Sequence, residues 1–257
     1  MQSDEPAYAA YEALAPIYNG FTHANDYEMW VGRVLLPELT RHGLPADGGK
    51  VLDVACGTGR AFAPLLRRGW QIHGCDLSPM MLRLAAREGG SEVALRVADM
   101  RELPTIGSFD LVLCLNDSVN YLLGNNDLAI ALSGMGRNLA DSGLLLFDVN
   151  SRLAYSNFHE EEREITYRGA RWLWRGHGEV APGIYESSIE GDGIPVVRHR
   201  ERFRPLAEVH EALAAADLDC VAALGMKEVE GTAVLNDPPD EAEHYKMVFI
   251  ARSKRPT

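Results

Sequence analysis

The chain has 257 residues, of which 46% are hydrophobic and 24% charged, and its formal net charge is -12. This length suits one globular domain with an insertion, and the excess of acid disfavours a nucleic-acid partner because it repels phosphate backbones. The opening segment MQSDEP has no basic or apolar stretch, and no later apolar run is long enough to cross a bilayer. We therefore expect a cytoplasmic protein without a membrane partner.

The first half of the chain alternates strands and helices. Residues 8–42 carry aromatic positions at helical spacing, and a turn-rich linker follows at 44–49. Five short apolar runs then predict strands, namely VLDVA, WQIHGCD, VALRVAD, FDLVLCL and LLLFDV. Between them, helices are expected at 59–68, 78–87 and 128–139, the second capped by Ser78. This order predicts an α/β fold, a parallel sheet with helices on both faces.

The pattern changes after Asn150. Aromatic and arginine-rich segments between residues 164 and 203 predict antiparallel strands. A helix at 206–216 and two more strands, DCVAALG and YKMVFIARS, then complete the chain. We expect residues 1–150 and 205–257 to form one domain with a helical cap at 1–45, interrupted by a β-rich insertion at 151–204.

The stretch KVLDVACGTGR, residues 50–60, joins the first strand to a glycine turn. It lacks the GxxxxGK[ST] pattern of a nucleotide-triphosphate loop, because no lysine follows its second glycine. It also departs from the dinucleotide fingerprint GxGxxG, because Phe62 occupies the third glycine position and Asp53 precedes the turn where a pyrophosphate would approach. The turn therefore favours a ligand without phosphates.

VLDVACGTG resembles motif I of the class I S-adenosylmethionine (SAM)-dependent methyltransferases. Asp76 closes the second strand 17 residues after Gly59, and Ala98 to Met100 end the third, as that family requires. The resemblance implies a Rossmann-like methyltransferase fold with a mostly parallel seven-stranded sheet plus the antiparallel insertion. It implies SAM as cofactor, S-adenosylhomocysteine as product, and the cofactor-binding residues Tyr18, Trp30, Asp53, Ala55, Gly57, Gly59, Asp76, Leu77, Asp99, Met100 and Leu115.

The N-terminal segment YEALAPIYNGFTHANDYEMW is similar to the front helices of two subfamilies, the amino-sugar N-methyltransferases and glycine N-methyltransferase. In those enzymes the segment folds over SAM. The resemblance implies that Tyr11, Tyr18 and Trp30 reach the site. For Tyr8 and Tyr27, burial of an amphipathic helix against the sheet is an equal alternative.

The polar cluster in CLNDSVNYLL, residues 114–123, directly follows a buried strand. Ligands of an open α/β sheet lie beyond the carboxyl ends of the strands, so Asn116, Asn120 and Tyr121 are expected to bind the methyl acceptor and Asp117 to take its proton. For Asn120 a role in building the loop is the alternative. The cluster is not the NPPY motif of enzymes that methylate bases or amides, which argues against DNA and glutamine as substrates.

The insertion contains nine arginines and no lysine between Arg152 and Arg204. Strand alternation places four of these arginines on one face and His199 with Glu201 on the other. If the second face is turned inward, His199 is a candidate base and Glu201 a candidate substrate ligand, with a buried structural histidine as the alternative. Trp174 would contact the acceptor, and the insertion would act as a lid. A dimer interface is the rival function, so monomer and homodimer both stay open.

Together these features predict an enzyme that transfers a methyl group from SAM to a small molecule, with nitrogen preferred as acceptor. An RNA or protein methyltransferase and a SAM-binding protein without turnover are the alternatives. No metal is expected: the four cysteines have no CxxC spacing, no HExxH motif occurs, and methyl displacement needs no Lewis acid.

Overall fold

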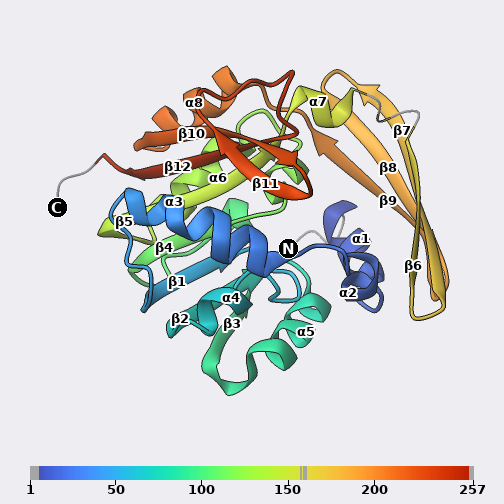
Figure 1. Ribbon diagram of the computed structural model, residues 1–257, viewed down its shortest axis with the longest axis horizontal. Helices are drawn as coiled ribbons and strands as arrows, with labels where there is room; N and C mark the ends of the chain where they lie inside the picture. The colour runs from blue at the N-terminus through green and yellow to red at the C-terminus, as the bar shows by residue number, and fades with distance from the viewer. Residues whose placement is uncertain (1–5, 157, 159–160, 255–257) are drawn as a thin grey trace.

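The computed structural model describes residues 6–156, 158 and 161–254, which form two sheets with helices between and around them (Figure 1). The central sheet has eight strands in the order β11-β10-β12-β5-β4-β1-β2-β3. Their bounds are β1 (Gly49–Val54), β2 (Trp70–Asp76), β3 (Val93–Val97), β4 (Phe109–Cys114), β5 (Leu139–Asn150), β10 (Leu218–Val229), β11 (Thr232–Asn236) and β12 (Lys246–Ser253).

Strands β1 to β5 are mutually parallel, whereas β12 runs antiparallel to both β5 and β10. The mostly parallel Rossmann-like sheet is therefore confirmed, and all seven expected strands are present. The eighth strand, β11, forms a hairpin with β10. The sequence gives little sign of β11 because its five residues are all partly or fully exposed and show no buried face.

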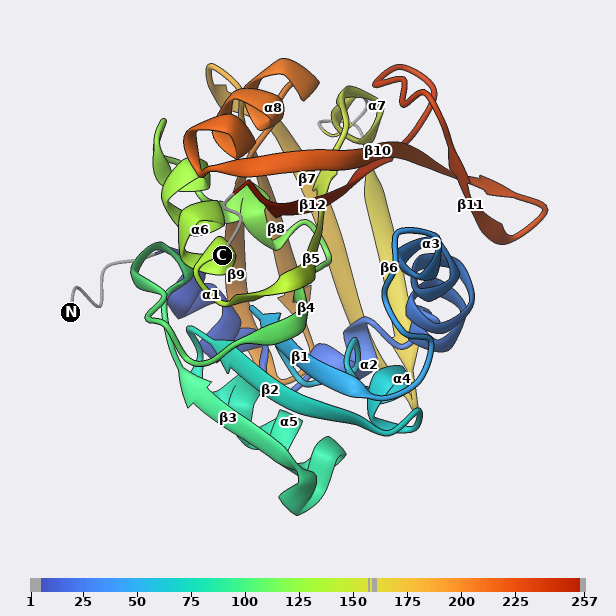
Figure 2. The same cartoon turned by 90° about the vertical axis from the view of Figure 1, so that its left-hand side faces the viewer.

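Helices cover both faces of this sheet, as Figure 2 shows for α6 and α3. One face packs against α6 and α8, the other against η1, α3, α4 and α5. Their bounds are η1 (Glu28–Leu35, π-helical), α3 (Leu36–Arg41), α4 (Ala63–Leu66), α5 (Pro79–Gly89), α6 (Asp127–Gly136) and α8 (Leu206–Ala215). Ser78 caps α5 as expected, its hydroxyl accepting from the Met81 amide at 3.1 Å. Short turns complete the connections: η2 (Gly90–Glu92), η3 (Met100–Glu102), η4 (Ser118–Tyr121) and α7 (Arg152–Tyr155).

The helix expected at 59–68 is wrong in extent, because only α4 is helical there. Gly59 has a positive φ of 83°, and the Phe62 ring lies directly beneath it, so that a Cβ at Gly59 would meet the ring at 2.4 Å. Phe62 is fully buried. The bulky residue that breaks the dinucleotide fingerprint thus plugs the space under the glycine turn and delays the helix.

The second sheet is antiparallel and consists of β6 (Glu162–Tyr167), β7 (Ala170–Ala181), β8 (Ile184–Gly191) and β9 (Ile194–Arg202). The N-terminal helices α1 (Pro6–Leu14) and α2 (Tyr18–Phe21) lie between it and the central sheet (Figure 1). Leu14 packs with Trp172 and Val197 of the second sheet. On the opposite side, Glu12 accepts hydrogen bonds from the Ser78 hydroxyl at 2.6 Å and the Met80 amide at 3.0 Å. Helix α1 therefore joins the two sheets.

A buried ion cluster ties three segments of the central sheet together. The Lys246 ammonium at the start of β12 donates to Asp148 of β5 at 2.7 Å and to Asp117, which follows β4, at 2.6 Å. The Asp117 amide also donates to Asp148 at 2.9 Å. Burial lowers the pKa of Lys246, but the two carboxylates outweigh it and leave that pKa raised.

No helix in the described part of the chain is both long and apolar enough to cross a membrane.

We expect Lys246→Met to lower the free energy of unfolding by about 3 kcal/mol, because it leaves the buried Asp148 carboxylate and the partly buried Asp117 carboxylate without a counter-charge. Urea denaturation measures this loss. Lys254→Met is the matched control: its side chain is 40% exposed and its ammonium lies 3.8 Å from Asp219, so the expected cost is under about 1 kcal/mol. Equal losses in the two variants would contradict a structural role for the cluster.

Candidate functional site

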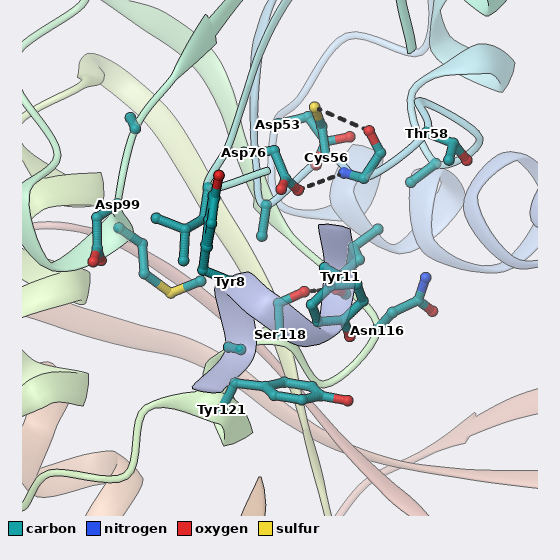
Figure 3. Close-up of a pocket in the computed structure, with 18 of the residues that line it drawn as sticks. Tyr8, Tyr11, Asp53, Cys56, Thr58, Asp76, Asp99, Asn116, Ser118 and Tyr121 are labelled. Carbon is teal, nitrogen blue, oxygen red and sulfur yellow. Dashed lines mark hydrogen bonds between the residues drawn. The ribbon is translucent and has the colours of Figure 1, made fainter. Parts of the chain in front are cut away.

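A pocket opens at the carboxyl ends of β1, β2 and β4 and beneath α1 and α2, and encloses about 1010 Å³ of space including its mouth. Figure 3 shows Asp53 and Asp76 at one end of it and Tyr121 at the other. Its lining contains twelve of the residues expected from the sequence, which are Tyr11, Tyr18, Asp53, Ala55, Gly57, Asp76, Leu77, Asp99, Met100, Leu115, Asn116 and Tyr121.

The glycine turn shapes the first end of the pocket. Ala55 and Gly57 both have positive φ angles, 57° and 52°. Such a φ is costly for alanine, and this kind of strain concentrates at functional sites. A Cβ at Gly57 would meet no protein atom within 4 Å. Because Gly57 lines the pocket, its bare backbone leaves space for a ligand to approach the main chain closely.

Two buried carboxylates stand beside the turn. Asp76 accepts from the amides of Gly57 and Ser78, each at 2.8 Å. Burial raises the pKa of Asp76 to about 6, against these hydrogen bonds, which lower it. Asp53 is more isolated, since its Oδ2 is buried without any hydrogen-bond partner. Burial, reinforced by the negative charge of Asp76, raises the pKa of Asp53 to about 8. An acid in this state would be stabilised by a cationic or hydrogen-donating ligand.

Asp99 lies farther along the pocket wall and is already paired. The Arg101 guanidinium donates to both its oxygens, at 3.1 Å and 2.5 Å, and the Arg101 amide donates at 2.9 Å. Burial acts to raise the pKa of Asp99, but these contacts with Arg101 outweigh it and leave the pKa lowered. Asp99 is therefore a charged carboxylate with its main interactions satisfied within the protein.

The front helices close the pocket with tyrosine rings. Tyr8 and Tyr27 line it together with the expected Tyr11 and Tyr18, and Tyr27 is at the same time buried in the core beside the central sheet. Their position is fixed through Arg60 of the glycine turn, which donates to the Thr22 and Asn25 carbonyls at 2.7 and 2.8 Å. The sequence gives no signal for Arg60, because it stands outside every motif.

Seven expected site residues do not line the pocket, and four of them are Trp30, Gly59, Trp174 and Asn120. Trp30 packs in the core beside Tyr27, with 6.2 Å between the two ring centroids, and Tyr27 rather than Trp30 lines the pocket. Gly59 lies over the Phe62 ring. Trp174 faces Phe158 and the Arg163 guanidinium within the second sheet. The Asn120 side chain donates to the Arg202 carbonyl at 2.8 Å, which agrees with the alternative that Asn120 builds the loop.

The two expected catalytic residues also lie outside the lining. Asp117 is not part of the lining, and its carboxylate is paired with the Lys246 ammonium at 2.6 Å. His199 is buried behind Tyr121, its Nδ1 3.5 Å from the Tyr121 hydroxyl. Burial lowers the pKa of His199 to about 4, so the ring is neutral at physiological pH. The sequence does not single out Lys246 as a functional residue. Its only signal there is that it is a lone lysine at the start of an apolar strand.

The alternation expected over residues 198–204 is met within β9 but not beyond it, because Arg204 follows the strand and is fully buried. His199 and Glu201 are buried on the inner face. Arg198 and Arg200 lie on the opposite face, where both pair with Glu186, at 2.7 and 2.9 Å. Glu201 likewise lies behind Tyr121 rather than in the lining, its Oε1 3.5 Å from the Tyr121 hydroxyl.

Known proteins with similar sequences or structures are methyltransferases. A family model described as a methyltransferase domain matches residues 51–143. YqeM of Bacillus subtilis (strain 168), named as a methyltransferase, is 30% identical over 210 residues, covering 78% of each chain. A dTDP-4-amino-2,3,4,6-tetradeoxy-D-glucose N,N-dimethyltransferase of Saccharopolyspora spinosa is 30% identical over 136 residues, or 52% of this chain and 53% of that one.

Two solved structures extend the likeness over nearly the whole fold. A SAM-dependent methyltransferase from Clostridium acetobutylicum ATCC 824 superposes with a TM-score of 0.74 at 21% identity, covering 95% of this chain and 99% of that one. SAM-bound CalS10, an amino pentose methyltransferase from Micromonospora echinaspora, gives 0.66 at 19% identity, with 92% and 94% covered. With the parallel sheet, the glycine turn and the acid at the end of β2, these likenesses show that the chain belongs to the methyltransferases and has the class I SAM-dependent fold.

Proposed function

We propose that this methyltransferase transfers the methyl group of SAM to the amino group of a small molecule in the cytoplasm. The observation that carries the proposal is the unpaired, buried Asp53 carboxylate beside the glycine turn. A pyrophosphate would oppose the ionisation of this carboxyl, whereas a ligand with a cationic amino-acid end and a sulfonium would favour its ionisation and be stabilised by it. The lining's two basic residues, Arg60 and Arg101, are engaged with backbone carbonyls and with Asp99, which further disfavours a dinucleotide.

The residues of the pocket fit SAM in its parts. The backbone of Ala55 and Gly57 would approach the methionine moiety, with Asp53 beneath it. Asp76 has lone pairs left beyond its two amide contacts and would accept from both ribose hydroxyls. An adenine ring would lie along the pocket wall near Asp99. The apolar side chains available to contact it are Leu77, Met100 and Leu115.

The acceptor would bind at the other end of the pocket. Tyr11, Tyr121, Asn116 and Ser118 line that end, with Asp117 and Glu201 behind them. Tyrosine faces attract cations, and no basic side chain lines this end among the described residues. These features favour an amine, in keeping with the sugar N,N-dimethyltransferase among the relatives, and they disfavour an RNA or an anionic acceptor.

Bound SAM would supply an electrophilic methyl group on a good leaving group. The protein's part is to hold the acceptor nitrogen in line with that methyl and to exclude water, which can contribute several kcal/mol. The second sheet, with α1 beneath it, would act as the lid over this end. Its outer face carries paired ions such as Arg198 and Arg200 with Glu186, which suits contact with solvent better than a dimer interface.

Calorimetric titration with SAM and with NAD tests the cofactor, and transfer of labelled methyl to matched pairs such as glucosamine and glucose, or glycine and glycolate, tests the acceptor. Binding of SAM but not NAD, with transfer only to amines, supports the proposal. Tight SAM binding without transfer to any acceptor class would instead identify a SAM-binding protein without turnover.

We expect Asp76→Asn to weaken SAM binding by about 1.5–3 kcal/mol, the usual worth of a hydrogen bond to a charged group. The control is Asp110→Asn at the amino end of β4, on the side of the sheet away from the pocket. Its carboxylate also accepts a hydrogen bond from a backbone amide, that of Lys50, at 2.8 Å. Calorimetry on both folded variants measures the difference. Unchanged affinity in Asp76→Asn would remove Asp76 from the cofactor site.

We also expect SAM binding at pH 7 to release on the order of one proton from Asp53, since a cation held nearby ionises a carboxyl whose pKa stands at about 8. The affinity should accordingly rise with pH between 7 and 8. Asp76, with a pKa of about 6, is already mostly ionised there. Calorimetry in buffers of different ionisation enthalpy counts the proton. Groups on SAM titrate alike against both proteins, so equal release in wild type and Asp53→Asn would contradict this role.

A further inference from the structure

Glu201 is a buried carboxylate that the proposed cofactor site does not use. Its Oε2 accepts from the Tyr155 hydroxyl at 2.8 Å and from the Asn150 side chain at 3.1 Å. Its Oε1 faces the hydroxyl of Tyr121 at 3.5 Å. Tyr121 is a lining residue of the pocket. One oxygen is thus fixed by the protein, while the other is held loosely toward the acceptor end.

Several ionisable groups from different elements surround this carboxyl. Burial, together with the negative charge of Asp117, raises the pKa of Glu201 to about 7, and Lys246 opposes that rise only in part. The groups that face Glu201 or share its network are Tyr11 of α1, Asp117 after β4, Tyr121 of η4, Tyr155 of α7, His199 of β9 and Lys246 of β12. Glu201 therefore gains and loses its proton within the range where a base is effective.

We propose that Tyr121 and Glu201 form a relay that removes a proton from an ammonium acceptor before methyl transfer. The Tyr121 hydroxyl passes its proton to Glu201 Oε1 while it takes one from the acceptor nitrogen, so that R–NH3+ and carboxylate become R–NH2 and carboxylic acid. The freed lone pair then forms the N–CH3 bond as the S–CH3 bond breaks with its electrons going to sulfur. Glu201 returns its proton to solvent after turnover.

The other candidates are less suited to this role. Asp117 is held by the Lys246 ammonium, 2.6 Å from its Oδ1. His199 also reaches Tyr121, but burial holds its pKa at about 4, so it cannot retain a proton near neutrality. Neither lines the pocket, whereas Tyr121 does, and its hydroxyl faces His199 and Glu201. Glu201 acts only through Tyr121 and is in this sense a positioning residue.

Ionisation of Glu201 can be observed without any acceptor. In protein labelled with 13C at the glutamate carboxyls, with SAM bound, we expect one resonance to titrate near pH 7 and to vanish in Glu201→Gln. Tyr121→Phe should shift that midpoint, because it removes the facing hydroxyl. A Glu201 signal that remains ionised down to pH 5 would overturn the relay, whatever the acceptor.

The kinetic test rests on the proposed function and uses the amine that the methyl-transfer screen identifies. Wild-type kcat/KM should rise through about pH 7; Glu201→Gln and Tyr121→Phe should lose this limb and at least about 100-fold in kcat. Glu201→Asp should restore part of it. The control is Glu186→Gln, a carboxylate on the outer face, which should keep the limb.

The outcomes separate the two proposals. An amine that is methylated with the same pH profile in Glu201→Gln as in wild type overturns the relay and leaves the proposed function standing. Transfer to hydroxyl acceptors alone overturns both, because the relay requires an ammonium group.

Discussion

The buried contact of Lys246 with Asp117 and Asp148 is the interaction on which the acceptor end of the site depends. It joins the start of β12, the carboxyl end of β5 and the loop after β4, which are far apart in sequence. That loop holds Asn116 and Asp117 at positive φ, a conformation that costs energy in residues other than glycine. The ammonium and the Asp148 carboxylate, which accepts the Asp117 amide, hold the loop in this conformation. Tyr121 follows directly, so its position in the pocket depends on the same contact.

The cofactor end is organised differently, by a lack of partners. Asp53 has an unpaired oxygen, Gly57 leaves space where a side chain would stand, and both belong to the same strand and turn. Unsatisfied buried carboxylates destabilise a folded protein, so a pocket that keeps one is suited to a ligand that can satisfy it. The two ends of the pocket thus differ in their electrostatics. One presents carboxylates, which suit a cationic cofactor, and the other presents tyrosines with Glu201 behind them.

Helix α1 connects the central domain to the second sheet. It contacts the start of α5 through Glu12, packs against the second sheet through Leu14, and turns Tyr8 and Tyr11 into the pocket. Any movement of the second sheet would therefore displace α1 and the residues with which it lines the pocket. Helices α1 and α2 cover the face of that sheet that carries Trp172. Trp172 packs against Leu14 and Gly20 and is therefore not free to cover an acceptor directly.

The sequence alone determined the fold class, and it also indicated most of the residues that line the glycine-turn end of the pocket, because these depend on local patterns. Strand runs, the glycine turn and the acids at strand ends, such as Asp76, have fixed spacing within the chain. Only the tertiary structure decided the acceptor end, where long-range contacts set the chemistry. Asp117 carries a carboxylate, the type of group expected of a base. Strand β12, however, places the Lys246 ammonium in contact with it, from a position 129 residues later in the chain. Trp30 and Tyr27 share one helical segment, and packing alone chose which of them faces the pocket. His199 and Glu201 lie on one strand face and are both buried, and burial lowers the pKa of the imidazole while it raises that of the carboxyl.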